Sequence, residues 1–63
     1  MSARDAQRAC TRLSALCAKG DAVLYADETY DVPQGFYVYG RGRFDLLGET
    51  EDAARAALAN VRR

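Results

Sequence analysis

The chain has 63 residues, which is enough for one domain only, and a domain of this size buries about 60% of the surface that its unfolded chain exposes. Hydrophobic residues make up 49% of the chain and charged residues 29%, a composition that excludes intrinsic disorder. The formal net charge is zero, so overall charge gives no argument for a nucleic-acid partner. We expect a single small domain over residues 1–63.

Charge is distributed unevenly along this neutral chain. Residues 1–20 carry four basic side chains against Asp5, whereas residues 21–40 carry four acidic side chains and no basic one. A dipolar molecule of this kind can steer a charged partner at either end. Eight arginines against one lysine, together with frequent alanine, indicate a bacterial or phage source with GC-rich DNA.

The sequence predicts neither a disulfide nor a metal site. Cys10 and Cys17 are seven residues apart, which on one helix is roughly 10 Å along the axis and too far for a disulfide. Histidine is absent, and two cysteines cannot complete a zinc site. We expect buried, reduced thiols, no cofactor and a cytoplasmic location. No apolar run resembles a signal peptide or approaches the roughly 20 residues of a membrane span, so we expect no membrane partner.

Residues 3–19 have the pattern of an amphipathic helix. Ser2 can cap its N-terminus, with Asp5 three residues later. Lys19 and Gly20 supply a basic last turn and a terminal glycine. The apolar stripe consists of Ala6, Ala9, Cys10, Leu13, Leu16 and Cys17.

Three strands and a second helix are predicted after this helix. Residues 22–28 form the first strand, residues 32–35 a turn, and residues 36–39 and 43–47 a β-hairpin. Gly48 then ends the sheet, and Thr50 caps a helix whose first turn carries Glu51 and Asp52. Its apolar stripe is Ala54, Ala57, Leu58 and Val61, and Arg62 and Arg63 lie at its basic end.

The two faces of the hairpin depend on the length of its loop. A two-residue loop, Arg41-Gly42, pairs Tyr39 with Phe44 and mixes apolar and polar side chains on both faces. A three-residue loop over residues 40–42 pairs Val38 with Phe44 and separates them cleanly, so we favour it. This register groups Phe36, Val38, Phe44 and Leu46 with Leu24 on one face, and Tyr25, Asp27, Tyr37, Tyr39, Arg43 and Asp45 on the other.

The predicted fold is a small two-layer α+β domain of order α-β-β-β-α, with a three-stranded antiparallel sheet. Both helices have an apolar stripe that needs a cover, and the apolar face of the sheet can provide it. Packing both helices on that face leaves the tyrosine-bearing face without a cover. We expect this uncovered face to be a contact surface.

Catalysis is not expected from these residues. General acid–base or nucleophilic chemistry requires a group of tuned pKa in a pocket, and a core this small has little room for one. The cysteines are predicted to be buried, and Ser2 and Ser14 have no base near them in the pattern. We therefore predict no enzyme activity and no catalytic residue.

Two further motifs have ordinary structural explanations. The carboxylates Asp27, Glu28 and Asp31 lack the glycine and the spacing of a calcium loop, and acidic residues of this kind also protect a strand edge from pairing. Residues 40–43, Gly-Arg-Gly-Arg, lack the lysine and hydroxyl residue of a phosphate-binding loop. We interpret them as a solvated segment and a hairpin tip.

The uncovered face leads to a hypothesis about function. Tyrosine and arginine concentrate in protein-binding hot spots, so we predict a non-enzymatic protein-binding domain. In its sharper form it is an accessory inhibitor, of phage or mobile-element origin, that docks on the basic nucleic-acid-binding surface of a host defence complex such as a CRISPR effector. The predicted binding residues are Tyr25, Asp27, Glu28, Asp31, Tyr37, Tyr39, Arg41, Arg43 and Asp45.

Two alternatives stay open. One is a nucleic-acid-binding module that stacks bases on Tyr37 and Tyr39 and contacts phosphates through Arg41 and Arg43. The other is a self-associating structural subunit, a homodimer that compensates for its small core. We favour a protein partner over nucleic acid because acidic side chains are predicted on the same face.

Overall fold

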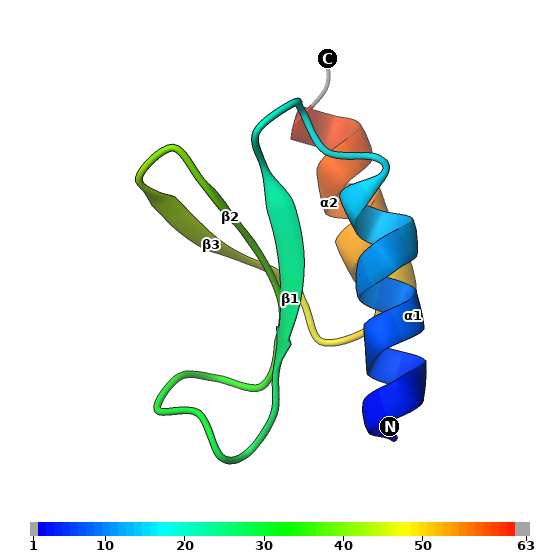
Figure 1. The fold of residues 1–63 in the computed structure, drawn as a ribbon, viewed down its shortest axis with the longest axis vertical. Coiled ribbons are helices and arrows are strands. Elements are labelled where there is room, and N and C mark those ends of the chain that lie inside the picture. Colours follow the sequence, from blue (N-terminus) through cyan, green and yellow to red (C-terminus); the bar gives the residue numbers. More distant parts are fainter. Residues whose placement is uncertain (1, 62–63) are drawn as a thin grey trace.

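The computed structural model describes residues 2–61 and has the element order that the sequence predicts (Figure 1). Its three strands form one antiparallel sheet with β2 in the centre, so the α+β fold is confirmed. The described part of the chain does not include Met1, Arg62, Arg63 or the side chain of Val61. The predicted basic end of the second helix, Arg62 and Arg63, therefore lies outside the described residues. The elements are α1 (Ala3–Ser14), β1 (Ala22–Ala26), β2 (Gly35–Gly40), β3 (Arg43–Gly48) and α2 (Glu51–Val61).

Both helices begin where their capping residues predict. The hydroxyl of Ser2 accepts a hydrogen bond from the backbone N–H of Asp5 at 3.2 Å. At the start of α2, the hydroxyl of Thr50 accepts one from Ala53 at 3.1 Å. Each bond satisfies a donor that the first turn of a helix leaves without a partner, which fixes the first helical residue.

α1 is shorter than the predicted helix over residues 3–19. It ends at Ser14, where tight turns take over: the N–H of Leu16 donates to the carbonyl of Leu13, and the N–H of Cys17 donates to that of Ser14. Gly20 does adopt a positive φ of 95°, but it does so in the turn that leads into β1 and not at the helix end. The prediction was wrong because these turns lead the chain into β1, where the N–H of Val23 donates to the hydroxyl of Ser14, a tertiary contact that the apolar pattern does not contain.

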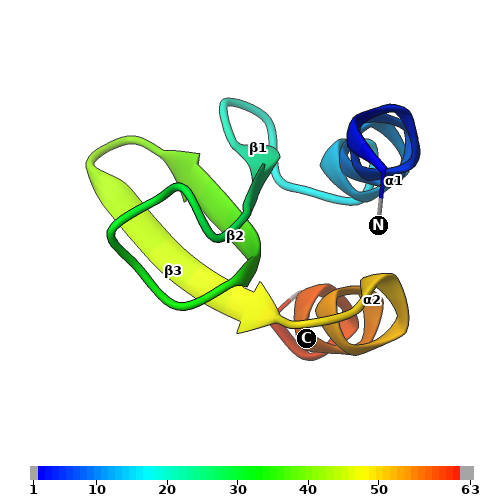
Figure 2. The same ribbon diagram turned by 90° about the horizontal axis from the view of Figure 1, so that it is seen from below.

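The helices lie side by side on one face of the sheet (Figures 1 and 2). α1 covers the β1 side and α2 packs against β3. The largest fully buried side chains are Phe36, Leu13 and Val38. The core cluster otherwise consists of small or medium side chains from both helices and β1, namely Ala9, Cys10, Val23, Ala54 and Leu58.

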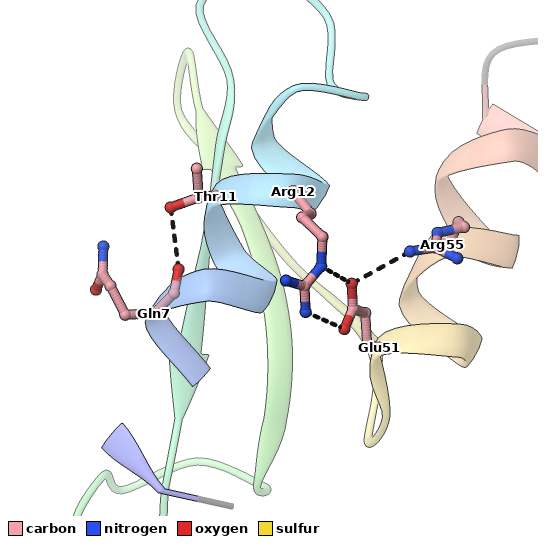
Figure 3. A network of polar contacts seen from close by, with 5 residues as sticks. All are labelled: Gln7, Thr11, Arg12, Glu51 and Arg55. Atoms are coloured by element: carbon pink, nitrogen blue, oxygen red, sulfur yellow. Dashed lines mark hydrogen bonds and ion pairs between the residues drawn. The ribbon is translucent and has the colours of Figure 1, made fainter. Parts of the chain in front are cut away.

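The two helices are also joined by an ion pair at their outer side (Figure 3). The guanidinium of Arg12 in α1 donates two hydrogen bonds of 2.7 Å to the carboxylate of Glu51, the first residue of α2. Arg55, one turn along α2, donates a third at 3.2 Å. These bonds lower the pKa of Glu51, and those from Arg12 contribute most. The two bonds from Arg12 connect residues that are 39 positions apart in the sequence.

The predicted hairpin register is wrong. Tyr39 pairs with Phe44 and Gly40 with Arg43, so the loop has two residues and not three. Arg41 and Gly42 both have positive φ, 49° and 80°, which is the conformation of the two-residue turn that matches the twist of antiparallel strands. The guanidinium of this left-handed arginine forms an ion pair of 3.2 Å with the carboxylate of Asp21.

This shorter loop exchanges the faces of β3. Phe44 and Leu46, predicted in the core, lie on the face away from the helices. Arg43 and Asp45, predicted on the uncovered face, share the helix-facing side with Val38. They are accommodated because the hairpin tip diverges from the helices and leaves them near solvent (Figures 1 and 2). A bulge at Leu47 lets this side chain pack against the core at the base of the hairpin.

Candidate functional site

The face of the sheet that has no helix on it carries large apolar side chains from all three strands. Tyr39, Phe44 and Leu46 are 42%, 50% and 49% exposed, and Leu24 of β1 lies beside them half-buried. Leu24 was predicted on the opposite face. The loop between β1 and β2 adds Tyr30 and Val32, which are also exposed. We call the exposed residues Tyr30, Val32, Tyr39, Phe44 and Leu46 the apolar patch.

This patch is large for so small a molecule. At roughly 200 Å² for a large side chain, the exposed fractions amount to about 460 Å² of surface, the tyrosine hydroxyls included. Monomeric proteins rarely expose more than a few hundred Å² together unless the surface binds something. This amount of exposed surface falls in the range of the largest apolar patch of a typical monomer, which is often functional.

Tyr37 lies on this face but is not part of its exposed area. Its ring is only 5% exposed, is stacked on Phe44 with centroids 4.7 Å apart, and is nearly parallel to it. Its hydroxyl donates a hydrogen bond of 2.6 Å to the carbonyl of Pro33 in the β1–β2 loop. Tyr37 thus connects the loop to the sheet through its hydroxyl and packs against the ring of Phe44.

Tyr25 does not belong to this face, contrary to the prediction. It pairs with Phe36 across the strands and its ring packs against Phe36 on the helix side, with centroids 4.9 Å apart. Alternation along β1 puts Tyr25 and Leu24 on opposite sides, and the pairing of β1 with β2 is the reverse of the faces predicted for these two residues. Tyr25 is a half-buried neighbour of the core.

The acidic residues lie at the end of the sheet where β1 stops. β1 ends at Ala26, two residues before the predicted end, because the carboxylate of Asp27 turns back to accept hydrogen bonds from the hydroxyl and the N–H of Thr29 at 2.6 and 2.9 Å. These bonds lower the pKa of Asp27. Asp27, Glu28 and Asp31 are all exposed, so they form an acidic rim beside the patch.

A hollow of about 440 Å³ connects this acidic rim with the patch. It runs beside β1, where Asp27, Tyr30 and Tyr39 line it together with Leu24, and Gln7 and Cys10 of α1 line its other wall. The structure thus brings Asp27 and Tyr39 together as predicted, although they reach this place from a loop and from the central strand. An incoming side chain can enter here between apolar and acidic groups.

The predicted basic residues, by contrast, are engaged with carboxylates. Arg41 and Arg43 approach the same oxygen of Asp21 at 3.2 and 3.8 Å, and Arg43 also pairs with Asp45 at 3.0 Å. The side chain of Asp21 is only 3% exposed, so its charge is held by these guanidiniums. Asp21 was not predicted to matter for the hairpin, because its partners lie 20 or more residues away and only the observed register brings them together.

The thiols are not arranged for chemistry. Burial raises the pKa of Cys10, and also that of Cys17, which is half-buried and not fully buried as predicted; this disfavours the nucleophilic thiolate form of both. Both are free, and within residues 2–61 no three histidine, cysteine, aspartate or glutamate side chains gather as metal ligands would. None of the helices in that range is long and apolar enough to cross a bilayer.

Comparisons with known proteins found no relationship. No protein-family model matches the chain, and no curated protein or solved structure is significantly similar to it. Arguments about function therefore rest on the surface itself.

Proposed function

We propose that this chain is a small, non-enzymatic protein-binding domain and that its contact surface is the apolar patch. The observation that carries the proposal is the exposure of Tyr39, Phe44 and Leu46 together on the one sheet face that no helix covers. Burying these side chains against a partner releases the water that now surrounds them, which favours association. Aromatic residues in this position are typical interface anchors.

The chemistry of the partner follows from the surroundings of the patch. Asp27, Glu28 and Asp31 border one end, so a partner with an apolar centre and a basic rim is complementary. A nucleic-acid-binding surface of a host defence complex is basic and so complements the acidic rim. We therefore retain the proposal that the chain is an accessory inhibitor of such a complex. The proposed contact surface no longer includes Arg41, Arg43 and Asp45, because these side chains pair among themselves and with Asp21.

Photo-cross-linking tests the surface directly. A photoreactive phenylalanine analogue in place of Tyr39, on the central strand, is expected to form covalent adducts with a protein of the native host. The same analogue in place of Arg8, exposed on α1, is the matched control. Equal adducts from both positions, or none from position 39, would refute the proposal. Replacing Asp27 and Asp31 by arginine tests the rim: unchanged capture and unchanged salt dependence would remove the acidic contribution.

Nucleic acid is the second candidate, because the exposed rings of Tyr39 and Phe44 also suit base stacking. It requires arginines for the phosphates, and those of the hairpin are already paired with Asp21 and Asp45. Anisotropy titrations at low salt with single- and double-stranded probes distinguish the two candidates. Binding that falls steeply with salt and is lost in Arg41→Ala with Arg43→Ala would favour nucleic acid.

A further inference from the structure

Among residues 2–61, β3 is an edge strand whose outer side has no partner strand. The two-residue loop fixes the direction of its backbone groups, since Gly40–Arg43 closes the turn as a hydrogen-bonded pair. Val38–Asp45 is the next such pair. The N–H and C=O groups of Phe44 and Leu46 therefore point away from β2, toward the outside of the sheet.

The other edge of the sheet is protected in a way that β3 is not. On β1 the outward N–H of Val23 donates to the hydroxyl of Ser14 at 3.0 Å. An exposed edge with apolar side chains is a template for pairing with another strand. β3 offers such an edge, with Phe44 and Leu46 both about half exposed.

We propose that two copies of this chain pair through their β3 strands, antiparallel, with Phe44 opposite Phe44 of the second copy. The dimer has a continuous six-stranded sheet about a two-fold axis. Phe44 then exchanges two backbone hydrogen bonds with Phe44 of the second copy that the monomer leaves to water, and Leu46 lies opposite Gly42 in the hairpin loop of that copy.

The charges of β3 select this register among three. With Phe44 opposite Phe44, each Arg43 lies opposite Asp45 of the second copy, which gives two cross-strand ion pairs. With Phe44 opposite Leu46, the two Asp45 carboxylates face one another and repel. With Leu46 opposite Leu46, the pairing runs through the bulge at Leu47 and sets Asp45 against this apolar side chain.

The side chains have room for this arrangement. Arg43 and Asp45 are 37% and 59% exposed on the helix-facing side of the sheet, and they already pair at 3.0 Å within one copy. The Phe44 rings meet on the opposite side, where cross-strand aromatic pairs stabilise antiparallel strands. A net charge of zero adds no repulsion between copies. The dimer also joins two apolar patches into one surface, which makes the proposed protein-binding function bivalent.

Sedimentation at several concentrations, from about 10 µM to about 1 mM, tests the dimer. The expected result is a reversible monomer–dimer equilibrium. Asp45→Arg sets Arg43 against a second arginine at both cross-strand positions and is expected to weaken association at least about tenfold. Asp52→Arg, the same charge change on the exposed side of α2, is the control and should associate like the wild type. A monomer at every concentration overturns the inference.

Amide hydrogen exchange followed by NMR tests the edge itself. Protection of the Phe44 amide is expected to increase with protein concentration, whereas that of Tyr25, which points outward on β1, should stay unchanged. A dimer that leaves the Phe44 amide unprotected associates through another surface and overturns the inference. Asp45→Arg leaves the apolar patch intact, so partner capture by its monomer reports on the proposed function separately.

Discussion

Tyr37 and Tyr39 are expected to respond very differently to alanine, although they are two residues apart on the same face. Tyr37 is 95% buried against Phe44 and the β1–β2 loop, whereas Tyr39 is 42% exposed. Replacing a buried aromatic side chain by alanine costs about 3–5 kcal/mol, and the lost hydroxyl bond to Pro33 adds about 1 kcal/mol. A domain of this length has a free energy of unfolding of roughly 3–9 kcal/mol. Tyr37→Ala therefore removes about half of the stability or more.

Tyr39→Ala should cost much less. Only part of its ring is buried, which corresponds to about 1–2 kcal/mol. Tyr37→Phe keeps the stacked ring and loses only the hydrogen bond, so it should cost about 1 kcal/mol. Urea unfolding followed by far-ultraviolet circular dichroism measures all three. Equal losses for Tyr37→Ala and Tyr39→Ala would contradict the burial of Tyr37, and the loop would then not be held by it.

Three further predictions concern the framework of the site. Gly40→Ala should destabilise the fold by at least about 2 kcal/mol, because the φ of Gly40 is +146° and a Cβ there would lie 2.5 Å from the carbonyl oxygen of Gly20. Gly42→Ala is the comparison: the φ of Gly42 is +80° and a Cβ there meets open space, so this variant should cost about half as much in the same urea titration. Ser14→Ala removes the acceptor of the Val23 N–H and should cost about 1 kcal/mol, seen as a melting temperature about 4–8 °C lower; an unchanged melting temperature would contradict that role. The pKa of Glu51 is lowered in the folded chain, so its ionised form stabilises the fold above the ordinary carboxyl value of 4.5, and this stabilisation is lost as pH falls through the lowered pKa. The difference in melting temperature between wild type and Glu51→Gln should accordingly disappear in acid, and a difference independent of pH would argue against the Arg12 bond.

The features that the sequence predicts correctly depend on near neighbours in the chain. Ser2 and Thr50 cap their helices because a hydroxyl reaches an N–H three residues ahead, whatever the rest of the chain does. The same holds for the acidic first turn of α2. The order of helices and strands follows from such signals together with hydrophobic periodicity.

The features that it predicts wrongly depend on distant partners. The hydroxyl of Ser14, at the end of α1, bonds to Val23, nine residues further on, and the guanidinium of Arg41 bonds to Asp21, 20 residues back. The two-residue loop requires a positive φ at Arg41, and the residue that Arg41 contacts in this conformation, Asp21, lies outside the hairpin. The pattern of β3 contains none of this information, so the faces of the hairpin could not be assigned from it.

The error in register itself gives an argument about function. The cleaner pattern was preferred on the assumption that only one face of the sheet needs apolar side chains. In the structure both faces have them: Phe36 and Val38 lie under the helices, and Phe44 and Leu46 lie on the open side. Both described helices lie on the same face of the sheet and leave the other open. The apolar second face therefore supports the proposed protein-binding function, and the shorter hairpin loop is what places Phe44 there.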